Sequence, residues 1–239
     1  MFITWPNAVS NESTIWRYMD FSKFVDLLDS QRLFFTRLSK LRKDDPYEGS
    51  LVPFYPNYKE GKSSEIIKES DKGLPNDFFV SCWHLSDIES AALWKLYSNS
   101  NECIAIKSTV AKLVSSIVHN EGYCNTSIEI KAVEYGHEKA RSRNNNSNSV
   151  RSFDVVFTKR REFAHEKELR LAIWADTLPT PILPDAPGLK LEVNLESMIS
   201  EIVIGPEAPD WTKDLVKSIS KKYDFSFEIK QSTLLKLTL

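Results

Sequence analysis

Charged and apolar residues alternate along the segment 166–173. Glu166, Glu168 and Arg170 stand at every second position. The apolar residues between and after them are Leu169, Leu171 and Ile173. Because successive side chains of a strand point to opposite faces, this spacing predicts a strand with its apolar face on the core and the charges on the other face, directed into a pocket. On a helix, Glu166 and Arg170 would instead form an ion pair on a solvated surface.

Helices are expected where apolar residues recur at helical spacing. Asp20 or Ser22 is a suitable N-terminal cap for the first helix, and Ser86 with Glu89 three residues later forms a capping box for the second. Further helices are expected within 108–119 and 209–223. A helix from Ser152 is expected to pass into the charged strand near Glu166.

Strands are expected in β-prone runs bounded by turn residues, at 14–18, 32–38, 77–84, 102–108, 127–136, 189–195, 199–206 and 224–232. Polar or proline-rich segments predict mobile loops near 53–76, 138–150 and 176–188, the first with at most one short helix. We find neither an internal repeat nor a clear linker. The sequence therefore predicts a single α+β domain over 1–239, with a mixed, mostly antiparallel sheet flanked by helices.

Composition and charge are those of an ordinary globular protein, with 41% hydrophobic and 27% charged residues. The net charge of -2 gives no general attraction to nucleic acid or anionic membrane, so nucleic-acid binding would need a local basic patch. No apolar run reaches the roughly 20 residues of a membrane helix, and the N-terminus has no signal-peptide pattern. The widely spaced Cys82, Cys103 and Cys124 are expected to be free thiols, which favours a cytoplasmic protein.

Motifs for common cofactors and metals are absent from the sequence. Nothing matches a Walker A loop, a G-x-G-x-x-G fingerprint or a G-x-S-x-G elbow, and the chain has only 7 glycines. No histidine pairs with another at zinc spacing, and Cys82 with His84 supplies only part of a ligand set. No metal is expected.

Aromatic residues cluster around the segment 81–97. Ser81 and Trp83 lie on an expected strand, and Trp94 and Tyr97 share one face of the helix that follows. We expect this face to pack towards the same concavity as Glu168. Core packing explains each aromatic residue alone equally well.

Two further charged residues are candidates for a site. Arg17 stands between two aromatic residues in the run WRY. Glu48 ends the turn that begins at Asp45, and it is expected to pair with a cation, either Arg17 or Arg170.

Four segments resemble one family when they are taken together. They are WRYMDFSKFVDLLDSQRLFFTRLSKLRKDDPYEG, VSCWHLSDIESAALWKLYSNSNECIAIKS, FTKRREFAHEKELRLAIW and EIVIGP. Their order resembles the bacterial domain-of-unknown-function family 2971, in which an Asp-Pro-aromatic-Glu turn, a Cys/Ser strand, a Trp-x-x-Tyr helix and an E-x-E-x-R strand follow one another. The run NECIAIKS departs from that pattern, since it lacks the glycine expected before its strand. This family implies no reaction.

A second similarity implies an activity. Arginine on a first strand, serine on a middle strand and E-x-E on a late strand are similar to the arginine–serine–glutamate ADP-ribosyltransferases, which implies that fold and NAD as candidate substrate. By position, Arg17 would bind the NAD pyrophosphate and Ser81 would order the nicotinamide-ribose pocket. Glu168 would hold the ribose and stabilise an oxocarbenium-like state, with Glu166 facing the acceptor. The serine here stands in SCW rather than in a Ser-Thr-Ser run.

The same similarity gives roles to the neighbouring residues. Trp83 or Tyr97 would stack on nicotinamide or adenine, while Glu48, Trp94 and Arg170 would support the site. Glu168 is expected to remain ionised beside an arginine. Replacing it with glutamine is then expected to abolish NAD cleavage and to change the melting temperature by only a few degrees.

Other functions fit parts of the sequence. In a Mg²⁺-dependent nuclease, Asp44, Asp45 and Glu48 with Glu166 or Glu168 would hold the ion, and the run FTKRREF would contact phosphates. In a non-enzymatic module, the Trp/Tyr helix would bind a nucleotide or peptide. Family 2971 is associated with bacterial toxins and phage defence, but the acceptor stays unknown.

Overall fold

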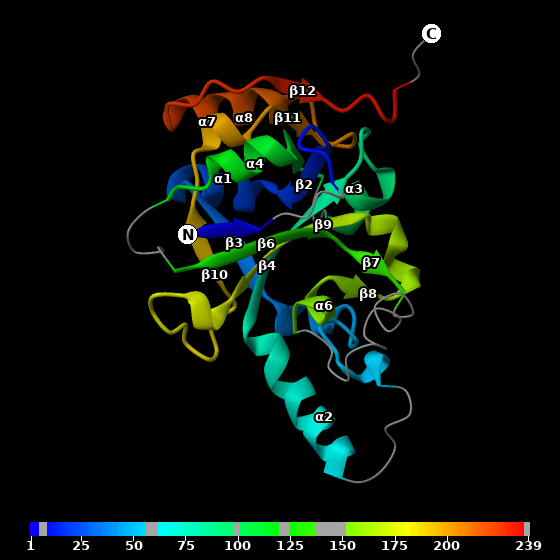
Figure 1. The fold of residues 1–239 in the computed structure, drawn as a ribbon. Helices are drawn as coiled ribbons and strands as arrows, with labels where there is room; N and C mark the ends of the chain where they lie inside the picture. Colours follow the sequence, from blue (N-terminus) through cyan, green and yellow to red (C-terminus); the bar gives the residue numbers. More distant parts are fainter. Residues whose placement is uncertain (5–8, 56–61, 98–100, 120–124, 137–151, 237–239) are drawn as a thin grey trace. The chain divides into compact units, whose positions relative to one another are not determined.

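The structure is a computed structural model that describes residues 1–4, 9–55, 62–97, 101–119, 125–136 and 152–236 (Figure 1). The chain divides into two compact units. The first unit comprises Met1–Asn7, Phe34–Cys82 and His119–Lys190, and the second comprises Ala8–Leu33, Trp83–Val118 and Leu191–Leu239. Strand β4 (Phe78–Leu85) contributes its first residues to the first unit and its last residues to the second.

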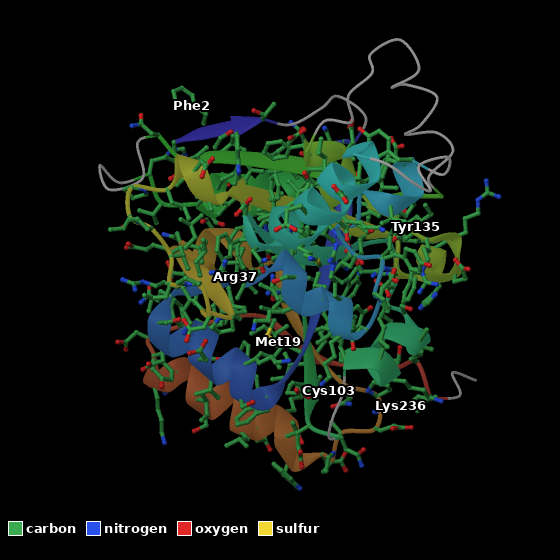
Figure 2. All side chains as sticks on the ribbon, turned by 90° about the horizontal axis from the view of Figure 1, so that it is seen from below. Phe2, Met19, Arg37, Cys103, Tyr135 and Lys236 are labelled. Atoms are coloured by element: carbon green, nitrogen blue, oxygen red, sulfur yellow. The ribbon has the colours of Figure 1, made fainter. Side chains whose placement is uncertain are left out.

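A mixed sheet forms the centre of the first unit. Its strands run in the order β1 (Phe2–Thr4), β6 (Ser127–Ala132), β9 (Glu168–Trp174), β4 and β3 (Arg32–Arg37), with β10 (Gly188–Glu192) beside β3. β1 pairs with β6 in parallel, whereas the pairs β6–β9 and β3–β4 are antiparallel. β1 lies at the outer edge of this sheet, where Phe2 points outwards (Figure 2). β7 (Glu134–Tyr135) and β8 (Thr158–Lys159) form a separate parallel pair.

The remaining elements of the first unit are mostly short. The α-helices are α2 (Lys62–Gly73) and α6 (Ser152–Val156). The 3-10 helices are η1 (Leu38–Lys43), η2 (Val52–Phe54), η3 (Leu74–Asn76), η5 (Arg161–Glu166) and η6 (Ala175–Thr177). The segment 53–76 thus holds a helix longer than the short one expected. The proline-rich segment is tied to β3, because Arg37 donates hydrogen bonds to the carbonyl oxygens of Leu183 and Ala186 (Figure 2).

The second unit contains a sheet and its covering helices. β5 (Cys103–Thr109) lies between β2 (Thr14–Asp20) and β11 (Glu201–Ile204), antiparallel to both, and β12 (Ile229–Gln231) pairs in parallel with β11. The helices are α1 (Phe21–Ser30), α3 (Ala91–Tyr97), α4 (Val110–Ser116), α7 (Leu195–Met198) and α8 (Trp211–Lys222). Figure 1 shows α7 and α8 beside β11. The predicted α+β class, with a mixed, mostly antiparallel sheet flanked by helices, is confirmed.

Each unit has an apolar core. In the first, Leu169, Leu171 and Ile173 are fully buried, as the alternation predicted. The opposite face of β9 is also covered, because Ala172 packs in a cluster with Phe78 and Val156. Strand β9 is therefore buried on both faces, and its even-numbered charged residues do not face open solvent. In the second unit, a cluster of buried residues is formed by Trp16, Tyr18, Leu93, Trp94, Cys103, Ala105 and Val203.

The long helix predicted from Ser152 to near Glu166 is wrong beyond Val156, where α6 ends. Thr158 Oγ1 donates a hydrogen bond back to the carbonyl oxygen of Asp154, and β8 then pairs with β7. Glu166 lies at the end of η5 and not on the strand. Lys167 follows with a φ of 41°, a left-handed conformation that separates η5 from β9.

The capping box predicted at Ser86 is also wrong. Helix α3 begins at Ala91, and Ser90 precedes it with its Oγ accepting a hydrogen bond from Leu93 N at 3.4 Å. Ser86 Oγ accepts from Ile88 N in the preceding turn. The Glu89 carboxylate, which would have completed the box, accepts from Trp94 Nε1 at 2.7 Å.

Other expectations concern cysteines, loops and membranes. Cys82 and Cys103 are free thiols, while Cys124 and the predicted loop 138–150 fall outside the described residues. Within the described part of the chain, no helix has the length and apolar character needed to cross a bilayer.

Candidate functional site

Five charged side chains of the first unit are buried together and are called the charge cluster here. They are Glu48, Lys159, Glu166, Glu168 and Arg170, each at most 8% exposed. Burying a charge is costly unless it is paired and hydrogen-bonded. The contacts within the cluster therefore decide what it can do.

Arg170 lies at the centre of the charge cluster and is fully buried. It shares a face of β9 with Glu168, as the alternation predicted, and its Nε donates to Glu168 Oε2 at 2.6 Å. Its Nη1 donates to Glu48 Oε1 at 2.6 Å and to the carbonyl oxygen of Val156 at 2.7 Å. The predicted pairing of Glu48 with Arg170 is confirmed.

The turn that carries Glu48 is fixed by a glycine. Glu48 N donates to the carbonyl oxygen of Asp45, and Gly49 follows with a φ of 65°. A Cβ at Gly49 would lie 2.7 Å from Leu38 Cδ2, so a larger residue would strain the turn sterically as well as conformationally. This turn delivers the Glu48 carboxylate to Arg170.

Lys159 joins the carboxylates of the charge cluster. Its Nζ lies 2.7 Å from Glu166 Oε2, 2.8 Å from Glu168 Oε1 and 3.6 Å from Glu48 Oε2. It also lies 4.6 Å from the centroid of the Phe163 ring. Although Glu166 is not on β9, Lys159 thus holds its carboxylate beside that of Glu168.

The two neighbouring glutamates have opposite pKa shifts. Burial would raise the pKa of Glu168, but the charges of Arg170 and Lys159 and its hydrogen bonds hold it well below its usual range. Burial and the adjacent Glu168 carboxylate raise the pKa of Glu166 to about 8, against the opposing effect of Lys159. At neutral pH, Glu168 is therefore ionised, as predicted, and Glu166 is mostly protonated.

Lys159 and Cys82 both keep their protons at neutral pH. Burial lowers the pKa of Lys159, but the Glu168 and Glu48 carboxylates more than offset this and raise it above its usual value. Burial, with the charge of Glu168, raises the pKa of the Cys82 thiol. Cys82 is therefore a protonated thiol of low reactivity.

Residues predicted for NAD binding belong to both units. Ser81 lies in the first unit and is buried on β4. Arg17, Trp83 and Tyr97 lie in the second unit. Arg17 Cζ lies 5.6 Å from the centroid of the buried Trp83 ring, and Tyr97 is 40% exposed.

Trp94 is a core residue of the second unit. It is 3% exposed and packs edge-on against Tyr18, with 4.9 Å between ring centroids. Tyr97, expected on the same helix face, is much more exposed than Trp94. That this face is directed towards Glu168 stays a prediction.

Sequence reasoning missed Lys159 and Tyr135. The sequence places Lys159 in a basic run expected to contact phosphate, and Tyr135 in an ordinary strand. The available signal for Lys159 was its place directly after the β-prone run VVFT, since a strand residue there can point inwards.

Of the carboxylates proposed to hold Mg²⁺, four are paired with cations instead: Asp45, Glu48, Glu166 and Glu168. Asp45 Oδ1 accepts a hydrogen bond from Arg160 Nε at 3.0 Å, and Glu48 pairs with Arg170. Asp44 is exposed. Across the described residues, no group of three or more histidine, cysteine, aspartate or glutamate side chains is arranged to hold a metal ion. The arrangement gives no support to the nuclease alternative.

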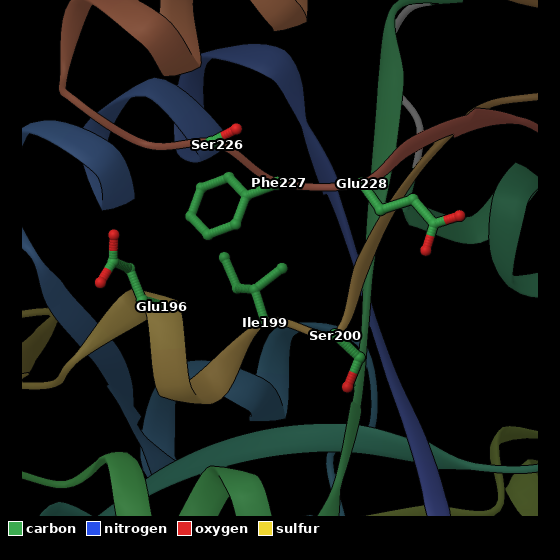
Figure 3. Close-up of a pocket in the computed structure, with 6 residues that line it drawn as sticks. All are labelled: Glu196, Ile199, Ser200, Ser226, Phe227 and Glu228. Carbon is green, nitrogen blue, oxygen red and sulfur yellow. The ribbon is translucent and has the colours of Figure 1, made fainter.

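A small pocket lies in the second unit. Its volume is about 200 Å³, and it is lined by Glu196, Ile199, Ser200, Ser226, Phe227 and Glu228 (Figure 3). In Figure 3 Ile199 and Phe227 point into the space, whereas the Glu228 carboxylate points aside. None of the candidate site residues lines this pocket.

Comparisons with known proteins give a slight structural likeness. No family model and no curated protein matches the chain, so the resemblance to family 2971 stays a prediction. The chain is similar to Thermus sp. 2.9 DarT in complex with NAD+, with 9% identity and a TM-score of 0.42 over 96% of this chain and 98% of that one. It is also similar to Thermus sp. 2.9 DarT in complex with ADP-ribosylated ssDNA, with 10% identity and a TM-score of 0.43 over 97% and 98%. Likeness at these values assigns neither a fold nor an activity.

Proposed function

We propose that the chain is an ADP-ribosyltransferase-like enzyme that cleaves NAD and transfers ADP-ribose to an acceptor. The supporting observation is a pair of buried carboxyl groups held side by side, with Lys159 Nζ 2.7 Å from Glu166 Oε2 and 2.8 Å from Glu168 Oε1. Their surroundings shift the two pKa values in opposite directions. Pairs of carboxyl groups whose surroundings separate their pKa values are typical of sites that move both charge and protons.

The chemistry of glycosyl transfer needs both charge states. As the bond from ribose C1′ to nicotinamide breaks, its electron pair leaves with nicotinamide and positive charge develops on the ribose. The fixed negative charge of Glu168 would stabilise that positive charge. The acceptor then bonds to C1′ and gives up a proton, which Glu166 in its ionised form would accept. Because that form is the minority at neutral pH, activation of the acceptor should increase as pH rises towards 8.

Within the second unit, NAD would be bound by Arg17 with Trp83 and Tyr97. The Arg17 guanidinium is kept near the Trp83 ring, and its planar donors match a diphosphate. The exposed ring of Tyr97 offers a surface on which nicotinamide or adenine could stack. These roles follow from the similarity in sequence order.

A nucleic-acid strand is the acceptor that the surface next to the charge cluster suits best. Arg160 Cζ lies 5.2 Å from the ring centroids of both Tyr47 and Phe163, and Tyr47 is 46% exposed. Arg161 and Lys167 are exposed nearby in sequence. Exposed rings interleaved with cations bind bases by stacking and phosphates by charge. Tyr47→Ala should weaken the binding of a fluorescent single-stranded oligonucleotide, and unchanged anisotropy curves would exclude this acceptor surface.

Nicotinamide release from NAD, followed by chromatography, tests the proposed activity. Glu168→Gln should lower the rate at least about 10²-fold, because it removes the charge that stabilises the transition state. Arg17→Lys should raise the KM for NAD, since an ammonium cannot bind a diphosphate in the same bidentate way. Glu162→Gln is the matched control, because Glu162 is an exposed glutamate of η5 outside the charge cluster. Equal rates for the wild type and Glu168→Gln would refute the proposal.

A further inference from the structure

We propose that the short β7–β8 ribbon is a positioning element for Glu168, with Lys159 and Tyr135 as its positioning residues. The catalytic consequence rests on the proposed function, but the positioning itself does not. The segment 133–135 and Lys159 hold Glu168 through its main chain and its side chain together.

The ribbon is built so that its two side chains reach one residue. β7 and β8 are parallel, and Tyr135 is in register with Lys159. Glu134 N donates to the carbonyl oxygen of Phe157 at 2.9 Å, and Gly136 N donates to that of Lys159 at 2.8 Å. Side chains at one register position of a sheet lie on the same face. Tyr135 and Lys159 therefore extend together.

The main-chain N and O of Glu168 and its side-chain Oε1 are all hydrogen-bonded by Val133, Tyr135 or Lys159. Glu168 N donates to Tyr135 Oη at 2.8 Å. The carbonyl oxygen of Glu168 accepts from Val133 N, also at 2.8 Å. Lys159 Nζ donates to Oε1 at 2.8 Å, while Arg170 holds Oε2. Both the start of β9 and the direction of the carboxylate are fixed in this way.

The backbone just before Glu168 needs stabilising contacts. Lys167 has a φ of 41°, which non-glycine residues rarely adopt. Strained backbone of this kind persists only where the surroundings impose it. Lys167 N donates to the carbonyl oxygen of Ala164, and Tyr135 and Val133 bind the very next residue, so these contacts together hold the turn from η5 into β9.

Lys159 also lowers the proton affinity of both candidate carboxyl groups and holds their oxygens close together. It bridges Glu166 and Glu168, and the other groups facing its ammonium are Glu48 and the ring of Phe163. Without this cation, both glutamates would gain affinity for protons. The two would also lose the common partner that keeps their oxygens together.

A titration that does not depend on NAD tests the positioning directly. Carboxyl signals of ¹³C-labelled glutamate are followed by NMR against pH, with Glu166 assigned by the loss of its signal in Glu166→Gln. We expect Glu166 to titrate near pH 8 in the wild type, and at least about one unit higher in Lys159→Met. Lys112→Met, which removes an exposed lysine outside the cluster, should leave that midpoint unchanged. An unchanged midpoint in Lys159→Met would overturn the inference.

Kinetics then test the catalytic consequence. Lys159→Met and Tyr135→Phe should each lower kcat for nicotinamide release by about tenfold or more while leaving KM nearly constant. Lys159→Arg should restore part of the rate. If Lys159→Met does not fold, Tyr135→Phe decides, and an unchanged kcat in that variant would contradict positioning. A wild type that titrates as expected but never cleaves NAD would refute the proposed function and leave the positioning supported.

Discussion

At the scale of single residues, surroundings and not residue type set the two glutamates apart. Glu168 is hydrogen-bonded by Arg170 and Lys159 through its two different oxygens. Glu166 shares Lys159 with it and lies beside its negative charge. The sequence predicted the ionised state of Glu168 from the nearby arginine. It did not predict the raised pKa of Glu166, because that depends on a lysine whose position needed the fold.

The raised pKa of Glu166 predicts a dependence of stability on pH. Its folded-state pKa is about 8 against an ordinary value of 4.5, so the folded protein binds more protons between those values. The contribution of Glu166 to the free energy of unfolding is therefore full below about pH 4.5 and is lost as pH rises through 8. Wild-type melting temperatures should fall from pH 5 to about pH 9, and those of Glu166→Gln should fall less. Parallel curves for the two proteins would contradict this origin.

Because Glu168 is buried, Glu168→Gln should destabilise the protein more than the sequence alone indicates. From the sequence alone, Glu168→Gln was expected to change the melting temperature by only a few degrees. With Glu168 buried against Arg170 and Lys159, the variant leaves buried cations short of a partner, which should cost about 3–5 kcal/mol of unfolding free energy. Urea denaturation measures this cost. Glu162→Gln should lose almost nothing, and an equal loss in both variants would argue against a special role of the cluster.

At the scale of elements, helix α3 shows where local sequence rules stop. Ser86 and Glu89 have the spacing of a capping box, yet the helix begins later, after Ser90. Glu89 is used instead by Trp94 Nε1 and by Ser232 Oγ, which is distant in sequence. Tertiary hydrogen bonds thus outweighed the local motif.

The observed cap gives a direct prediction. Ser90→Ala should cost about 0.5–2 kcal/mol, because it removes the hydrogen bond to Leu93 N. Ser86→Ala should cost less, since Ser86 serves only a turn. Chemical denaturation of both variants measures the difference. If Ser86→Ala lost more unfolding free energy than Ser90→Ala, the result would support Ser86 as the N-terminal cap, as predicted from the sequence.

Trp94 tests the core of the second unit. It is 3% exposed and packs against Tyr18, so Trp94→Ala should cost about 3–5 kcal/mol. Trp211→Ala is the matched control, because Trp211 is 54% exposed. A thermal melt of Trp94→Ala that equals that of the wild type would show that this residue is not part of the core.

At the scale of the whole molecule, period-two patterns predicted most strands and the α+β class. The patterns did not reveal the two units, because each unit is assembled from separate stretches of chain and no linker lies between them. They placed β7 within one longer strand over 127–136, and they did not reveal β8, whose two residues are too few to show a period. Within the candidate site, alternation predicted the shared face of Glu168 and Arg170. The contribution of Lys159 required knowledge of the pairing between those short strands.

The central claim is that the chain consumes NAD through its paired glutamates. Its most direct test is incubation of the purified wild-type protein with NAD at neutral pH, with single-stranded nucleic acid present or absent, followed by quantification of free nicotinamide. The account predicts release well above that from NAD in buffer alone, and its loss in Glu168→Gln. If the folded wild-type protein neither binds NAD nor releases nicotinamide under either condition, the charge cluster is a structural element and the chain is a non-enzymatic binding module.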